Sequence, residues 1–176
     1  FFNPETGTYD YITPVKQNIL LHPIDDAGIV ILNQRELSTI VSDLPPVFII
    51  NKNVGFDEAV TKGFPIASLD QTSETGESSL VTLNMRYLQE IPTEHAFQLS
   101  TLDDYNEDSI KGMSGAGIFI EACEELYLNG IFTRFTDEDR GKVIYAQKLT
   151  SFNELLGNKY KKKMPLAFLG HHGLGY

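Results

Sequence analysis

Residues 110–119 read IKGMSGAGIF and place a single serine, Ser114, between glycines. Small residues on both sides of Ser114 allow the backbone to turn sharply and allow a substrate to approach closely. Such a turn exposes the hydroxyl and directs neighbouring backbone N–H groups toward one point, as a serine nucleophile with an oxyanion hole requires. The same ten residues also fit a glycine-rich β-turn before a strand, with no chemical role.

The residues after the serine predict a β-hairpin. Apolar runs at 117–120 and 126–132 flank the short acidic segment 121–125, a pattern typical of two paired strands. The nucleophile elbow of α/β-hydrolases, Gly-x-Ser-x-Gly, instead runs from its serine into a helix. Its fifth position is occupied here by Ala116, and the following sequence favours strands, so we set that alternative aside.

This region resembles the trypsin/chymotrypsin-like serine peptidases, whose nucleophile lies in a Gly-x-Ser-Gly turn. The segment 130–133 (GIFT) matches the Gly-Ile-x-Ser strand that borders their substrate cleft, with Thr133 in the place of the serine. Digestive members carry Asp before the nucleophile, whereas this chain has Met113. In having no Asp at this position the chain is more similar to bacterial members of the family. The absence of that Asp also argues against activation through a freed N-terminus. The resemblance extends over residues 19–160.

The resemblance implies an all-β fold, a double Greek-key β-barrel of the trypsin-like type with a C-terminal helix. Residues 1–50 would form the end of the N-terminal barrel, 51–160 the C-terminal barrel, and 161–176 a basic linker or tail. From the residue patterns we expect strands at 15–21, 80–88, 95–99 and 143–149. We expect a turn that ends a strand at residues 62–65 (KGFP). We also expect a helix at 151–160 with Ser151 as candidate N-cap.

The resemblance also implies a mechanism of acyl transfer. Ser114 would attack a peptide carbonyl, and the backbone N–H groups of Gly112 and Ser114 would stabilise the oxyanion. Thr133 and Phe135 would lie on the strand that binds the substrate.

Asp108, six residues before the nucleophile and followed by Ser109, corresponds in the family to the floor of the primary pocket. A carboxylate there implies cleavage after Arg or Lys, because a substrate cation would compensate the buried charge. Val143 falls near a position where such members keep a glycine, which would narrow the pocket. A solvent-facing Asp108 in an acidic loop is the alternative.

Residues 22–32 read HPIDDAGIVIL and resemble the strand that carries the triad aspartate in this family. Asp26 fits if the strand begins at Ala27, and Asp25 fits if Ala27 is the family's small residue two places on. We assign the catalytic role to Asp26 and keep Asp25 as the alternative. An acidic residue at the edge of a strand is also common without any catalytic role.

No histidine occupies the family's position for the general base, which lies well before the aspartate. His22 adjoins the aspartates, His95 lies between them and Ser114, and His171 and His172 are in the tail. We expect His22 and His95 to be surface or packing residues. The catalytic histidine would come from an upstream part of a larger regulated protein, or from a separate chain. A non-catalytic peptide-binding or scaffolding module is the other hypothesis.

The composition of the 176-residue chain restricts its partners. Its net charge of −10 disfavours nucleic acid and anionic membranes as partners. The resemblance implies a protein or peptide substrate. A single cysteine, Cys123, suits a reducing compartment and predicts a cytoplasmic location. The acidic segment 101–108 lacks the regular oxygen spacing of an EF-hand, and we expect no metal and no cofactor.

Overall fold

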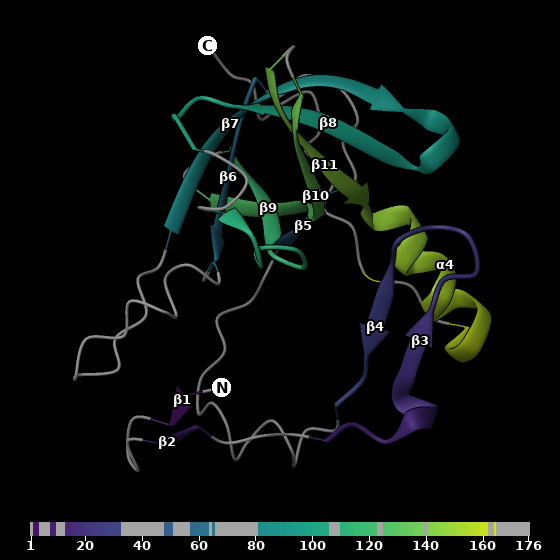
Figure 1. Cartoon of the computed structure of the whole chain (residues 1–176). Coiled ribbons are helices and arrows are strands. Elements are labelled where there is room, and N and C mark those ends of the chain that lie inside the picture. Colours follow the sequence, from purple (N-terminus) through teal and green to yellow (C-terminus); the bar gives the residue numbers. More distant parts are fainter. Residues whose placement is uncertain are drawn as a thin grey trace.

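Six antiparallel strands form a closed barrel in this computed structural model (Figure 1). The structure describes residues 2–3, 8–9, 13–32, 48–50, 57–63, 65, 81–105, 110–122, 125–138, 141–161 and 164. The barrel strands are β6 (Glu58–Gly63), β7 (Val81–Ile91), β8 (Ala96–Thr101), β9 (Gly117–Ala122), β10 (Glu125–Glu138) and β11 (Gly141–Lys148).

The strand order follows a Greek-key pattern. β6, β7 and β8 are neighbours in sequence order, and β9 returns to pair with β6. β10 then pairs with β9, and β11 pairs with both β10 and β8, which closes the barrel. This confirms the expectation of an all-β barrel. Because the barrel is closed, each of its strands has a paired neighbour on both sides over at least part of its length.

Alternation of side chains along the strands fills the barrel. On β7, Leu83 and Met85 are fully buried while Asn84 and Arg86, which alternate with them, are exposed, as expected when successive residues point to opposite faces. Leu99, Ile118 and Ile144 from three other strands join the same core. The interior is packed with side chains, so any binding site must lie at the rim or outside.

A second, two-stranded sheet lies beside the barrel and the C-terminal helix (Figure 1). It pairs β3 (Ile19–Leu21) with β4 (Gly28–Val30). The helix α4 (Leu149–Tyr160) follows β11 directly and packs its Leu149 and Phe152 against Ala27, immediately before β4. This apolar cluster brings the turn between β3 and β4 to the barrel wall.

Three short strands complete the described elements. β1 (Phe2–Asn3) pairs with β2 (Thr8–Tyr9), and β5 (Phe48–Ile49) pairs in parallel with β10. Ile50, just after β5, is buried in the barrel core. No helix in the described part of the chain is long and apolar enough to cross a membrane.

Two details of the predicted elements were wrong. The chain forms a 3₁₀ turn at Lys16–Asn18 before β3, rather than a continuous strand over 15–21. The helix begins at Leu149, two residues earlier than expected, with Lys148 as its N-cap. Ser151 therefore lies inside the first turn, where its hydroxyl bonds to another segment instead of capping the helix.

Candidate functional site

The Ser114 turn is fastened to the middle of β10. The Ser114 hydroxyl donates a hydrogen bond to the Thr133 carbonyl oxygen at 2.8 Å. The Gly115 N–H donates to the Phe132 oxygen and the Phe132 N–H donates to the Ala116 oxygen, each at 2.8 Å. The serine itself is exposed. The turn thus presents its hydroxyl to solvent from a position fixed by backbone contacts.

Glycine is required at two points of this turn. Gly112 and Gly115 have φ angles of 96° and 95°, a region that residues with a side chain rarely adopt. The N–H groups of Met113 and Ala116 bond to Ile110 and Met113 oxygens within the turn. In the described part of the chain, the N–H groups of Gly112 and Ser114 have no such acceptor. These two are the donors that an oxyanion hole would need.

Met113 anchors the turn from the opposite side. Its side chain is 2% exposed and belongs to the barrel core, where a Cβ on Gly63 would lie 3.1 Å from its Cε atom. A buried thioether contributes to packing. Unlike a carboxylate at this position, it cannot form an ion pair with a charged N-terminus.

β10 continues past Gly117, the first residue of β9, beside the serine. β9 pairs with β10 only as far as Ile131, and among the described residues only β11 pairs with the part of β10 from Arg134 to Glu138. Thr133 lies at an irregularity in the β10–β11 pairing, and its hydroxyl donates to the Tyr145 oxygen at 3.0 Å. Phe135 packs against the barrel core, while Arg134 is exposed. Among the described residues this edge next to Ser114 has no paired strand, which suits it to pairing with an extended peptide.

The two aspartates of the β3–β4 turn have different surroundings. The Asp25 side chain is 3% exposed, and its Oδ2 accepts a hydrogen bond from the Ser151 hydroxyl at 2.7 Å and lies 3.0 Å from His95 Nδ1. Asp26 is exposed and has no side-chain hydrogen bond within the described residues. Asp25 thus holds the turn to the barrel, whereas the carboxylate of Asp26 is available.

The contacts of Asp25 stabilise its charge. Burial raises the pKa of the Asp25 carboxyl, but the hydrogen bonds from His95 and Ser151, together with the nearby His22 and His95 rings, outweigh that effect. The pKa of Asp25 consequently lies below its ordinary value of 3.8.

A cavity of about 250 Å³ lies between this turn and the barrel wall. Asp25 and Asp26 line it on one side, and Thr133, Tyr145 and Gln147 from β10 and β11 line it on the other. Thr133, whose carbonyl oxygen accepts the Ser114 hydroxyl, connects this cavity to the serine turn, and the residues of the turn do not themselves line it.

The strand order of the barrel separates the His95 ring from Ser114. His95 immediately precedes β8, and β11 lies between β8 and β10. Two strand spacings of about 4.8 Å each place β8 about 10 Å from β10. No hydrogen bond joins either described histidine, His22 or His95, to Ser114.

Several predicted residues lie outside the described part of the chain: Asp108, Ser109, His171 and His172. Val143 is half-buried on β11, where it pairs with Ser100 of β8. The partners of Asp25 had no signal in the sequence, because Ser151 and His95 are 126 and 70 residues away along the chain.

No group of three His, Cys, Asp or Glu side chains within the described ranges is placed to hold a metal ion.

The chain matches no known protein-family model and none of the curated proteins with which it was compared.

Proposed function

We propose that this chain is the core of a trypsin-like serine endopeptidase in which Ser114 is the nucleophile. The observation that carries the proposal is the glycine turn. Ser114 is exposed beside a part of β10 that, among the described residues, pairs only with β11, and within those residues the Gly112 and Ser114 N–H groups have no acceptor. A peptide lying along β10 would present its carbonyl carbon to the hydroxyl and its oxygen to those donors. Thr133 and Phe135 belong to this edge.

The histidine of the proposed triad comes from another segment or chain and occupies the cavity. An imidazole there would lie beside the Asp25 and Asp26 side chains and beside Thr133, whose carbonyl oxygen accepts the Ser114 hydroxyl. Asp26 is the proposed orienting carboxylate because its side chain is available, whereas Oδ2 of Asp25 already has two partners. By the sequence resemblance, Asp108 with Ser109 would set a preference for cleavage after Arg or Lys.

The Ser114 contact also supports a second candidate function, a non-catalytic peptide-binding module. The hydroxyl donates to a carbonyl oxygen rather than to a histidine, and neither described histidine contacts it. Such a serine stays protonated and weakly nucleophilic. The free edge of β10 would still bind an extended peptide.

Turnover with added imidazole separates the two functions. The 176-residue chain alone should show negligible hydrolysis of fluorogenic peptides with Arg or Leu before the scissile bond, because a triad without its base keeps only oxyanion-hole and binding contributions. Imidazole at tens of millimolar should raise the Arg-peptide rate at least tenfold, and Ser114→Ala should remove that increase. Peptide binding with no increase at any imidazole concentration would favour the non-catalytic module. Fast turnover without imidazole would show that a histidine of this chain serves as base.

A further inference from the structure

The backbone of His95 is held in an unusual conformation. His95 has φ of 49°, in the left-handed region, and follows a 3₁₀ turn at Pro92–Glu94. Its carbonyl oxygen accepts hydrogen bonds from Gln147 Nε2 and from the Lys148 N–H, each at 2.9 Å, and its own N–H donates to the Pro92 oxygen at 3.3 Å. Non-glycine residues in this region are costly and persist where the surroundings fix them, often at functional sites.

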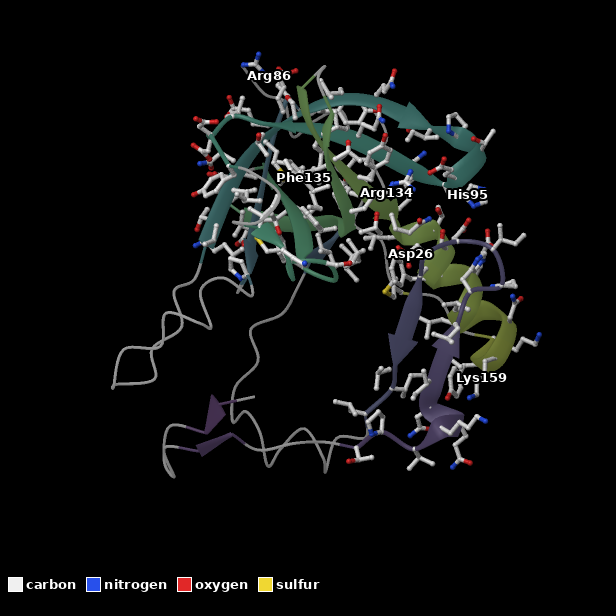
Figure 2. All side chains as sticks on the ribbon, viewed as in Figure 1. Asp26, Arg86, His95, Arg134, Phe135 and Lys159 are labelled. Carbon is white, nitrogen blue, oxygen red and sulfur yellow. The ribbon has the colours of Figure 1, made fainter. Side chains whose placement is uncertain are left out.

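The ring of His95 is oriented by a buried carboxylate. Its Nδ1 lies 3.0 Å from Oδ2 of Asp25, whose side chain is only 3% exposed. The ionised carboxylate only accepts hydrogen bonds, so Nδ1 carries the proton and the lone pair of the neutral ring is on Nε2. The His95 side chain is 50% exposed, and within the described residues Nε2 has no partner. Figure 2 shows His95 at the β7–β8 turn, with Asp26 on the hairpin turn below it.

His22 contacts the same carboxylate but has both ring nitrogens engaged. Its Nδ1 accepts a hydrogen bond from the Asp25 N–H at 2.9 Å, and its Nε2 lies 3.2 Å from Oε2 of Glu154 on α4. The His22 side chain is 7% exposed. The turn therefore holds two histidines of opposite character: His22 fastens the turn, and His95 presents a free lone pair to solvent.

We propose that Asp25 and His95 form a general-base site separate from Ser114, acting on small activated esters. Nε2 of His95 takes a proton from a water molecule while the water oxygen forms a bond to the acyl carbon. The leaving oxygen departs with the electron pair of the broken ester bond, and the imidazolium then returns its proton to that oxygen or to solvent. The Asp25 carboxylate stabilises the imidazolium as it forms.

The charges around the ring favour this step. Asp25 faces it from the β3–β4 turn, and His22 lies 3.5 Å from the same carboxylate. Glu94 precedes His95 and is paired with Arg134 of β10 at 3.1 Å, and Lys148 of β11 is paired with Glu90 at 3.1 Å. Because both of these neighbouring cations are paired with carboxylates, neither adds an uncompensated positive charge that would oppose formation of the imidazolium.

Hydrolysis of p-nitrophenyl acetate tests this site. All proteins carry Ser114→Ala, so that serine chemistry contributes nothing and the result is independent of the proposed peptidase function. In that background we expect His95→Gln to lower the rate at least tenfold, within the range of general-base contributions. His171→Gln, which removes a histidine from the tail segment 161–176, is the control, and its rate should stay within twofold. Equal rates in the His95→Gln protein and its parent, or equal losses in the two variants, would overturn the proposal.

Two further measurements separate chemistry from misfolding. Asp25→Asn should lower the rate in the same background, because the neutral amide cannot stabilise the imidazolium as the carboxylate does. A rate equal to that of the parent protein would contradict the pairing. In ¹H–¹⁵N spectra at pH 8, His95 should carry its proton on Nδ1 and His22 on Nε2. The reverse tautomer of His95 would also exclude the proposal.

Discussion

Replacement of Leu99 by alanine is expected to lower the free energy of unfolding by about 2–5 kcal/mol, the range for large-to-small changes in a packed core. Leu99 on β8 is fully buried in the barrel core. Its truncation removes contacts and leaves a cavity that the closed barrel cannot easily collapse, because neighbouring strands are paired on both sides. Urea denaturation followed by circular dichroism measures the change as a shift of the midpoint.

Leu102, just after the end of β8, provides the matched control. Its side chain is 47% exposed, so Leu102→Ala should change the free energy of unfolding by less than about 0.5 kcal/mol. Similar losses in the two variants would contradict the arrangement of this strand, in which Leu99 points into the barrel and Leu102 lies outside it.

Replacement of Asp25 by alanine should give the second-largest loss, about 1–3 kcal/mol at neutral pH. The fully buried Ser151 hydroxyl would lose its acceptor, and an unsatisfied buried donor costs about this much. Asp26→Ala in the adjacent position should be nearly neutral, since Asp26 is exposed. Thermal unfolding of both variants and the wild type makes the comparison. A larger loss for Asp26→Ala would contradict the orientation of the turn.

The contribution of Asp25 also depends on pH. Its pKa in the folded protein lies below the ordinary value, so the unfolded chain binds a proton more readily than the folded one. The stabilisation is therefore fully present above the ordinary value near 3.8 and is lost as the pH falls through the lower pKa of the folded state. The difference between wild type and Asp25→Ala should shrink below pH 4. A difference that grows on acidification would contradict the direction of this shift.

The barrel could be predicted largely from local sequence patterns. The two apolar runs after Ser114 indicated the β9–β10 hairpin, and the pattern of residues 80–88 indicated β7, because a strand in a barrel turns one of its faces toward the core. The Lys62–Pro65 turn likewise coincides with the end of β6 at Gly63. These features depend on residues close together in sequence.

The junction around Asp25 could not be predicted in this way. Ser151 has the character of a helix N-cap, and only the docking of the hairpin on α4 shows that its hydroxyl bonds to Asp25. His95 has no local pattern that indicates a carboxylate partner, and it was expected to be a surface or packing residue. Such contacts arise when distant segments meet, and one sequence alone contains no information on which segments do so.

Mass-spectrometric mapping with a serine-directed fluorophosphonate probe is the most direct test of the proposed nucleophile. The probe is applied to the 176-residue chain with imidazole present, and the chain is then digested and its peptides sequenced. A single adduct on Ser114, absent from Ser114→Ala and absent after unfolding in urea, is the result we predict. Labelling that persists in Ser114→Ala, or no adduct on Ser114 in the folded chain with imidazole, would contradict the assignment of Ser114 as nucleophile.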